Sequence, residues 1–179
     1  MTWSYIAGFF DGEGHVGTEG SNRNYLVSMS QATTRREVID NISSFLGKDG
    51  IRHRFSVKAP CVSHPRGHLT LIIDGYEPVY KFLQRVIPSL IVKYIEALVM
   101  LDRCDIALRK SAARNVRLRK AVIAYTNGMG LKEIRRVYHF SQPQIKNALA
   151  AEGKSLRPRG IAIRLYHQRQ HDASKQARL

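Results

Sequence analysis

Two carboxylates, Asp11 and Glu13, stand on either side of a glycine at the end of a short apolar segment, Tyr5-Ile6-Ala7-Gly8-Phe9-Phe10-Asp11-Gly12-Glu13-Gly14. Carboxylate oxygens are the side-chain ligands that Mg²⁺ prefers. The segment has helical spacing, and its last turn places both acids at the negative end of the helix dipole, which disfavours further negative charge. We therefore expect at least one of them to meet a cation or a set of N–H donors.

Gly8 and Gly12 are four residues apart, so on a helix they share one face and allow a second backbone to approach closely. Each interior glycine costs about 1 kcal/mol relative to alanine. A helix this short is not stable alone in water, so packing must stabilise it. The spacing favours a helix that packs against another copy of itself; the alternative is a buried glycine-rich helix or turn whose acids only cap backbone groups.

This segment is similar to the LAGLIDADG motif of homing endonucleases, with Ile6 at its first position and Gly14 at its last. In that family the motif helices pair at a dimer or pseudo-dimer interface, and the last acidic residue of each motif binds a divalent metal at the scissile phosphates. The resemblance implies metal binding by Glu13, together with the backbone at Gly12, and a capping, structural role for Asp11. The dimer interface that it implies contains Ala7, Gly8, Asp11 and Gly12.

The rest of the first 110 residues predicts an α+β fold of order αββαββα, with a curved antiparallel sheet and helices on one face. This is also the core fold of the LAGLIDADG family. Alternation and turn residues predict strands within 15–31, at 51–58 and at 68–74. A helix begins after Thr33 or Thr34 and is stopped by Gly47, a second runs from Pro78 to about Val86, and a third from about Ser89 to about Arg109.

One face of the predicted sheet is polar and free to enter a groove of DNA, since a two-stranded ribbon fits the major groove. Arg52 and Arg54 are the best candidates for guanine contacts, because a guanidinium can bond O6 and N7 together. A solvated face with ordinary charges remains the alternative for each residue. The weaker candidates on this face are Asn22, Asn24, Ser28, Ser30, Ser56, Lys58, Arg66 and Thr70.

Three further positions resemble the active site of the family. Gln31, at the end of a strand, corresponds to the position that orders water near the cleaved phosphate. Lys93, five residues after Pro88, corresponds to the basic residue that stabilises charge there; a lone lysine on an apolar helix is otherwise a surface residue. Arg35 is a possible fourth catalytic residue, although Arg36 could serve instead.

Phosphodiester hydrolysis needs cations at the attacking and leaving oxygens and an activated water. The resemblance implies Mg²⁺ as cofactor, with Mn²⁺ able to substitute and Ca²⁺ binding without supporting cleavage. The sequence contains a single motif, and cutting both strands needs two essential acids. We therefore expect a homodimer that prefers a long, near-palindromic site in double-stranded DNA.

The charge is unevenly distributed. The chain has 179 residues and a formal net charge of +15. Residues 1–102 contain 11 Lys+Arg against 10 Asp+Glu, whereas residues 103–179 contain 18 against 4. A strongly basic second part indicates a polyanionic partner, most often nucleic acid. The most apolar run, residues 90–101, is charged and too short to span a membrane, so we expect no membrane partner.

The two cysteines, Cys61 and Cys104, have no metal-ligand spacing, and we expect both to be reduced and structural. The sequence starts without a basic and apolar signal region. These features favour an intracellular protein, in the cytoplasm or nucleoid, or in an organelle if the host is eukaryotic.

The C-terminal region is predicted to hold a basic connector at 111–118, a helix-turn-helix region with a basic extension at 119–166, and an unordered tail at 167–179. Short helices at 119–125, 131–137 and 142–151, with Ser141 as a cap, resemble the helix-turn-helix of resolvase-like proteins. An ordinary three-helix core gives the same pattern. The residues expected to face bases or phosphates are Gln142, Gln144, Lys146, Asn147, Arg157 and Arg159.

Together these features predict a site-specific homing endonuclease, encoded by a mobile element, that makes double-strand breaks. The family resemblance implies cutting across the minor groove with short 3′ overhangs. Two alternatives stay open: a catalytically inactive transcriptional regulator of the same fold, and an RNA-binding intron splicing cofactor, or maturase.

Overall fold

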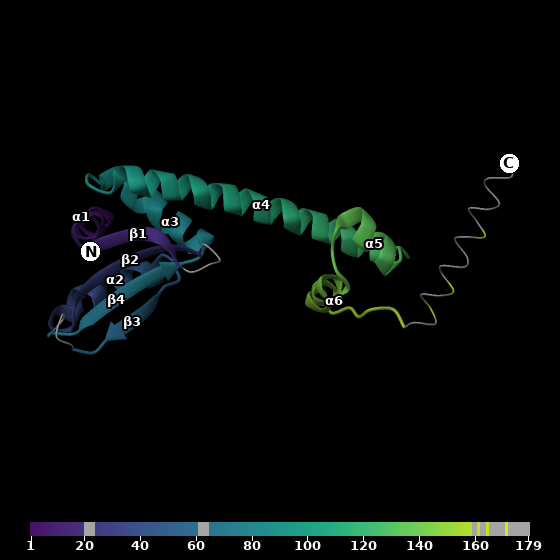
Figure 1. Cartoon of the computed structure of the whole chain (residues 1–179), viewed down its shortest axis with the longest axis horizontal. Coiled ribbons are helices and arrows are strands. Elements are labelled where there is room, and N and C mark those ends of the chain that lie inside the picture. The colour runs from purple at the N-terminus through teal and green to yellow at the C-terminus, as the bar shows by residue number, and fades with distance from the viewer. Residues whose placement is uncertain (20–23, 61–64, 159–160, 162–163, 165–170, 172–179) are drawn as a thin grey trace. The chain divides into compact units, whose positions relative to one another are not determined.

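The computed structural model describes residues 1–19, 24–60 and 65–158, together with residues 161, 164 and 171. Contacts divide the chain into two compact units, Met1–Arg109 and Lys110–Leu179. Figure 1 shows a sheet with helices in the first unit and helices alone in the second. The predicted α+β class with a helical C-terminal region is confirmed.

The first unit follows the predicted order of helices and strands. Its elements are α1 (Trp3–Glu13), β1 (Gly14–Glu19), β2 (Asn24–Ala32), the 3-10 turn η1 (Thr33–Arg35), α2 (Arg36–Lys48), β3 (Arg54–Lys58), β4 (His68–Asp74), α3 (Tyr76–Val86), the 3-10 turn η2 (Ile87–Ser89) and the start of α4 (Tyr94–Thr126).

The four strands form one antiparallel sheet in the order β1-β2-β4-β3. Met29 of β2 lies between Gly14 of β1 and Leu71 of β4, and residues directly opposite one another project to the same face. Helices α1, α2 and α3 pack on the inner face, against the central strands β2 and β4. The buried inner residues of these two strands are Val27, Met29, Leu69, Leu71 and Ile73.

Helix α1 is held against this core by aromatic contacts. Phe10 is fully buried and meets Phe82 of α3 edge to face, with ring centroids 5.3 Å apart. Trp3, the first residue of α1, meets Phe45 of α2 in the same way, with ring centroids 5.2 Å apart. Such pairs add about 0.5–1.5 kcal/mol each to the burial of their surface. These contacts fix the position at which α1 ends, and therefore the position of its two acids.

Two boundaries differ from the prediction. Thr33 does not cap α2: it lies in η1 and its hydroxyl donates to the carbonyl of Arg66, a bond that links η1 to the loop before β4. Gly47 does not end α2, which continues to Lys48, because a glycine inside a helix costs stability without blocking the backbone. The positive φ of 66° falls on Gly50, three residues later.

The strand predicted at 51–58 is shorter than expected. Only Arg54–Lys58 form β3, and its apolar residues Phe55 and Val57 are 44% and 68% exposed. They do lie on the inner face, opposite Leu71 and Leu69. However, β3 is an edge strand, and the helices pack mainly on β2 and β4.

The connector predicted at 111–118 is helical. Helix α4 runs without interruption from Tyr94 to Thr126, so the expected end near Arg109 and new start at Arg119 are both wrong. Residues 110–118 contain neither glycine nor proline and include two alanines, which favour a helix. The basic residues of this segment, on which the predicted connector was based, do not by themselves interrupt a helix.

The helices described up to residue 158 of the second unit are the end of α4, α5 (Leu131–Tyr138) and α6 (Gln142–Ala151). Between α5 and α6 the chain turns at His139, which has a left-handed conformation with φ of 59°. The side chains that form its core are Ala121, Val122, Tyr125, Ile134, Phe140, Ile145 and Leu149.

Cys104 is fully buried in the first unit and is a free thiol, as expected. Burial raises the pKa of its thiol to about 11. Cys61 and the tail at 167–179 lie outside the described residues, apart from His171. Among the described helices, none is long and apolar enough to cross a membrane.

Candidate functional site

The end of α1 is joined to the chain segment that precedes α4. The Asp11 carboxylate accepts hydrogen bonds from the backbone N–H groups of Ile91, at 2.7 Å, and Lys93, at 2.9 Å. The Lys93 ammonium donates in return to the backbone carbonyl of Asp11. Asp11 therefore meets the N–H donors that its unfavourable place at the end of a helix led us to expect.

These donors govern the charge of Asp11. Partial burial by itself raises the pKa of the carboxyl, but the N–H groups of residues 91–93 and the charge of Lys93 outweigh it, so the pKa lies below its ordinary value of 3.8. Because the folded pKa is depressed, the carboxylate stabilises the fold above pH 3.8. This contribution is lost as the pH falls through the folded pKa.

We expect Asp11→Asn to lower the free energy of unfolding by about 1–3 kcal/mol at neutral pH, because the backbone N–H groups of Ile91 and Lys93 lose a charged acceptor. The difference from the unmutated protein should shrink at a pH well below 3.8, because the carboxylate becomes protonated as the pH falls through its depressed folded pKa. Urea unfolding at both pH values measures it. Asp40→Asn is the control and should cost less, because Asp40 is in an exposed pair. An equal loss at both pH values for Asp11→Asn would contradict this role.

Glu13 is the last residue of α1 and its side chain is exposed. It forms no ion pair with any residue that the structure describes. The described residues contain no group of three His, Cys, Asp or Glu side chains that could hold a metal. Among the described residues, a single chain therefore offers the Glu13 carboxylate and the backbone carbonyl at Gly12. Both are oxygen donors, which Mg²⁺ prefers, but most of its ligands would have to come from other molecules.

Gln31 and Lys93 lie at the same end of α1 as Glu13. Gly14, which follows Glu13, pairs with Met29, so Gln31 is two residues farther along β2 on the inner face. Its side-chain oxygen accepts from the N–H of Ala32 at 3.0 Å. Lys93 is bonded to α1 itself through the carbonyl of Asp11. The three residues singled out from the sequence thus lie at the end of α1, near the end of β2 and in the segment before α4.

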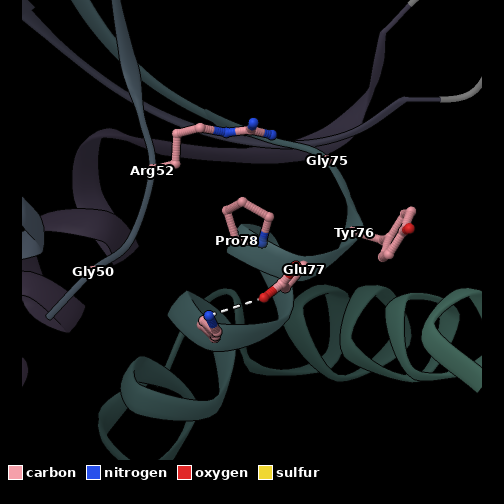
Figure 2. Close-up of a pocket in the computed structure, with 7 residues that line it drawn as sticks. Gly50, Arg52, Gly75, Tyr76, Glu77 and Pro78 are labelled. Carbon is pink, nitrogen blue, oxygen red and sulfur yellow. Dashed lines mark ion pairs between the residues drawn. The ribbon is translucent and has the colours of Figure 1, made fainter. Parts of the chain in front are cut away.

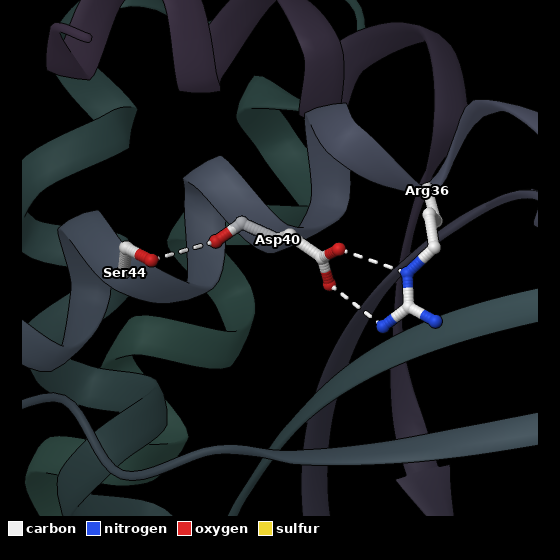
Figure 3. A network of polar contacts seen from close by, with 3 residues as sticks. All are labelled: Arg36, Asp40 and Ser44. Atoms are coloured by element: carbon white, nitrogen blue, oxygen red, sulfur yellow. Dashed lines mark hydrogen bonds and ion pairs between the residues drawn. The ribbon is translucent and has the colours of Figure 1, made fainter.

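Arg35 and Arg36 have different surroundings. Arg36 forms two hydrogen bonds to Asp40, one turn along α2, at 2.9 and 3.3 Å, and the Asp40 carbonyl accepts from Ser44 at 3.0 Å (Figure 3). Arg35 is exposed at the start of α2 and has no bond to a described residue. The geometry favours Arg35 as the residue available to a ligand.

The outer face of the sheet is mostly polar. Ser30 and Thr70 lie opposite one another on β2 and β4, and their hydroxyls are 2.9 Å apart. Arg54 of β3 forms an ion pair with Asp74 of β4 at 2.8 Å, so its guanidinium is already oriented across the face. The predicted residues that share this face are Ser28, Ser30, Arg54, Ser56, Lys58 and Thr70.

The sequence interpretation missed His15, His68 and Asp74 on this face. The strand alternation contained the signal, because each is an even number of residues from a polar position already chosen or opposite one in the register. His15 is exposed and stands two residues after Glu13. Its ring lies over Gly17, where an added Cβ would be 2.6 Å from the ring nitrogen Nε2.

Arg52 and Arg66 do not lie on this face, whereas Asn24 stands opposite Glu19 in the register, on the same side of β2 as Ser28. Arg52 precedes β3 and lines a hollow beside the start of α3, where Figure 2 shows its side chain reaching toward Gly75. Arg66 is exposed in the loop before β4. Asn22 and the side chain of Asn24 lie outside the described part of the chain.

One face of α1 is open to solvent. Gly8 and Gly12 are exposed, and a Cβ added at either would meet no described atom within 4 Å. The prediction that Ala7 contributes to an interface needs correction, because Ala7 is fully buried in the core of its own chain. The helix turns residue 7 inward and residues 8 and 12 outward, since residues four apart share a face and adjacent residues do not.

Apolar side chains continue this surface beside α1. The segment 89–93 contacts α1 through the bonds of Asp11 and a contact of Ser4 with Ser89. Single exposed apolar residues are ordinary on a protein surface, but a contiguous group indicates an interaction site. Ile91, Val92 and Ile95 are 86%, 75% and 67% exposed.

In the second unit, Gln142, Lys146 and Asn147, which are expected to face bases or phosphates, are exposed on α6. Gln144 was assigned wrongly. Its side-chain oxygen accepts from the N–H of Ser141 at 2.8 Å, so the side chain caps its own helix. The pattern Ser141-x-x-Gln144 is a capping box and was the signal for this role.

Arg157 was also assigned to the wrong partner. Its backbone N–H donates to the Tyr125 hydroxyl at 2.8 Å, its guanidinium donates to the carbonyl of Met129 at 2.7 Å, and the same group lies 4.2 Å from the Tyr125 ring centroid. Arg157 therefore fastens the segment after α6 to the end of α4. Arg159 lies outside the described residues.

Comparison with known proteins gives a match for the first unit. Residues 3–86 match the model of the LAGLIDADG-like domain. No curated protein matches the chain.

Two solved structures of the homing endonuclease I-CvuI are similar in part. One, in complex with the I-CreI target in 2 mM Mg with the DNA not cleaved, has a TM-score of 0.48 and 16% identity, over 86% of this chain and 96% of that chain. The other, in complex with its target in 2 mM Ca, has a TM-score of 0.47 and 17% identity over the same shares.

Proposed function

The N-terminal region of this chain, residues 3–86, belongs to the LAGLIDADG family, and from this premise we propose that the protein is a homodimeric, Mg²⁺-dependent DNA endonuclease of the homing type. The observation that carries the proposal is the bond of the Lys93 ammonium to the carbonyl of Asp11, two residues before Glu13. The position of Gln31 on β2, two residues beyond the partner of Gly14, supports it. This end adjoins the first strand of a sheet whose outer face is polar.

The chain contributes charge and position to the reaction. Glu13, with the backbone at Gly12, would hold the cation at the scissile phosphate. When bound, Mg²⁺ would neutralise phosphate charge and lower the pKa of a water molecule. The ammonium of Lys93, held by the carbonyl of Asp11, brings a second positive charge to the same end of α1. Such fixed charges need no reorganisation as negative charge develops on the phosphate.

Gln31 and Arg35 are proposed to act at the edge of this site. The Gln31 oxygen is taken by the N–H of Ala32, so the amide NH₂ group remains to bind water or a phosphate oxygen. Arg35 is exposed at the start of α2 and offers a planar donor group that matches a phosphate.

The homodimer is supported by the two glycines of α1. Nothing within the described chain requires glycine at positions 8 and 12: both have open space around them, and each costs about 1 kcal/mol in a helix. Close approach of the backbone of a second α1 would explain why glycine stands at these two positions. The exposed apolar residues Ile91, Val92 and Ile95 lie beside this face and would be covered in the same interface.

Two-fold symmetry would bring two copies of Glu13 to one DNA duplex, one for each strand. We propose that the outer sheet faces then read the two halves of a long site, with Arg54 oriented by Asp74 toward base edges. The second unit, proposed to be a helix-turn-helix, extends the contact surface through Gln142, Lys146 and Asn147 on α6.

The proposal is tested by incubating the protein with a randomised library of duplex DNA and Mg²⁺, and sequencing the ends of cut molecules. We expect one long, near-palindromic site, cut on both strands with short 3′ overhangs. Repetition with Mn²⁺ should retain cutting, and Ca²⁺ should support binding alone. Tight and selective DNA binding without any cutting would replace the proposal by a regulator. Preferred binding of structured intron RNA would replace it by a splicing cofactor.

A further inference from the structure

The second unit places two arginines of α4 over a single aromatic ring. The guanidinium carbon of Arg114 lies 5.8 Å from the centroid of the Phe140 ring, and that of Arg117 lies 5.4 Å from it. Both distances are within the range of a cation–π contact. Both side chains are nevertheless exposed, so their N–H groups remain open to solvent. Phe140 itself is only 2% exposed.

The helix period explains why these two arginines meet Phe140. Arg114 and Arg117 are three residues apart, and Ala121 continues the same stripe on the side that packs against α5 and α6. Along this side of α4, the residue inside the core of the unit, Ala121, is apolar, and the two residues that precede it outside the core, Arg114 and Arg117, are basic. Arg119, two positions after Arg117, projects from the opposite side of the helix.

The surroundings of the pair are positive and lack a balancing acid. Neither guanidinium forms an ion pair with a residue in the described part of the chain. Phe140 is followed at once by Ser141, the cap of α6, whose N-terminus carries the positive end of a helix dipole. Two like charges held against one ring repel each other, and a bound anion would relieve this repulsion.

The composition of the unit indicates which anion. Between residues 110 and 158 the chain has eleven basic residues and two acidic ones, Glu133 and Glu152. The basic residues are Lys110, Arg114, Arg117, Arg119, Lys120, Lys132, Arg135, Arg136, Lys146, Lys154 and Arg157. Such an excess suits the dense, regular charge of a nucleic-acid backbone more than an isolated carboxylate on a protein.

We propose that Arg114 and Arg117, held in place by Phe140, form a clamp for the phosphate backbone of duplex DNA at the start of α6. The clamp positions α6 so that its exposed residues Gln142 and Lys146 can approach the groove, whereas the pair itself contacts phosphates without reading sequence. This inference rests on the proposed function only in taking duplex DNA as the partner. It assigns the backbone contact to α4, not to the segment after α6.

The test separates charge from packing. Arg114→Met and Arg117→Met, combined in the full-length chain, keep an unbranched apolar side chain over Phe140 and remove only the guanidinium groups. Binding to a mixed-sequence duplex is measured in EDTA, which prevents cleavage, between about 50 and about 200 mM salt. The single variants Arg117→Met and Arg119→Met form a matched pair, since each removes one arginine from the same helix.

We expect the double variant to bind about tenfold more weakly at low salt and to reduce the slope of log affinity against log salt by about 2, close to one for each lost phosphate contact. The loss should be equal for every duplex sequence. Arg117→Met should show about half of the slope change and Arg119→Met almost none. The thermal midpoint of unfolding should stay close to that of the unmutated chain in each variant.

Equal slopes and affinities for Arg117→Met and Arg119→Met would overturn the clamp, because general charge would then account for the binding. A weaker affinity that follows a lowered thermal midpoint would also overturn it, in favour of a packing role. A competing structured RNA that displaces the duplex only from the unmutated chain would assign the pair to RNA. If the unmutated chain binds no duplex at any salt, the proposed function fails, and this outcome is distinct from the other three.

Discussion

Glu13→Gln is expected to abolish cleavage of the DNA target, with the rate falling by at least about a thousandfold, while DNA binding in Ca²⁺ or EDTA stays within a few-fold of the original. The amide has the shape of the carboxylate but carries no charge, so it holds a divalent cation poorly. Glu13 is exposed at the end of α1 and has no described ion-pair partner, so its loss should not affect folding.

The measurement is single-turnover cleavage of the site recovered from the duplex library, with both strands followed separately. Glu77→Gln is the control: it removes the same charge from an exposed pair with Lys81 at 3.0 Å, far along the chain from α1. This variant should cleave normally, since exposed pairs contribute little. Full activity of Glu13→Gln would show that another group holds the metal.

Gly8→Leu is expected to convert the protein into a monomer that has lost double-strand cleavage. In the single chain a Cβ added at position 8 meets no described atom within 4 Å, and Gly8 is exposed, so the fold should tolerate leucine. The helix should even gain about 0.8 kcal/mol, since glycine is the poorer helix former. In a dimer, two added side chains would force the paired helices apart, and we expect the dissociation constant to rise by about a hundredfold or more.

Sedimentation over a range of protein concentrations measures this change, and urea unfolding checks the fold. Gly47→Leu is the matched control, because Gly47 is also a helical glycine with no described atom within 4 Å of an added Cβ, but lies on α2. It should leave the dimer intact. If Gly8→Leu forms a dimer with the same dissociation constant as the unmutated protein, α1 does not form the dimer interface.

Both variants address parts of the site that the sequence alone identified. The spacing of Gly8 and Gly12 predicted a helix with an open face, and the fold has such a face. The strands predicted within 15–31 are present, and Val27 and Met29, two residues apart on β2, are both buried, as the period of a strand requires. These inferences succeeded because helix and strand periods are local properties: they assign residues to faces before any distant contact forms.

The partners of individual polar groups were decided by the tertiary structure. Asp11 is bonded to Ile91 and Lys93, eighty and more residues away, and no period in the sequence specifies that meeting. Arg157 was expected on DNA and instead packs on Tyr125, because the segment after α6 returns to the end of α4. A basic side chain alone does not indicate which acceptor or ring lies within its reach.

The sequence by itself determined the order of helices and strands, the faces of α1 and β2, and the residue types available for metal and phosphate chemistry. Only the tertiary structure decided which faces are covered. Phe55 and Val57 alternate with polar residues, as the residues of a half-buried strand do, but they lie on the edge strand β3 and remain exposed. Periodicity depends on neighbours along the chain, whereas burial depends on which elements pack above a strand, and that is settled only when the whole unit folds.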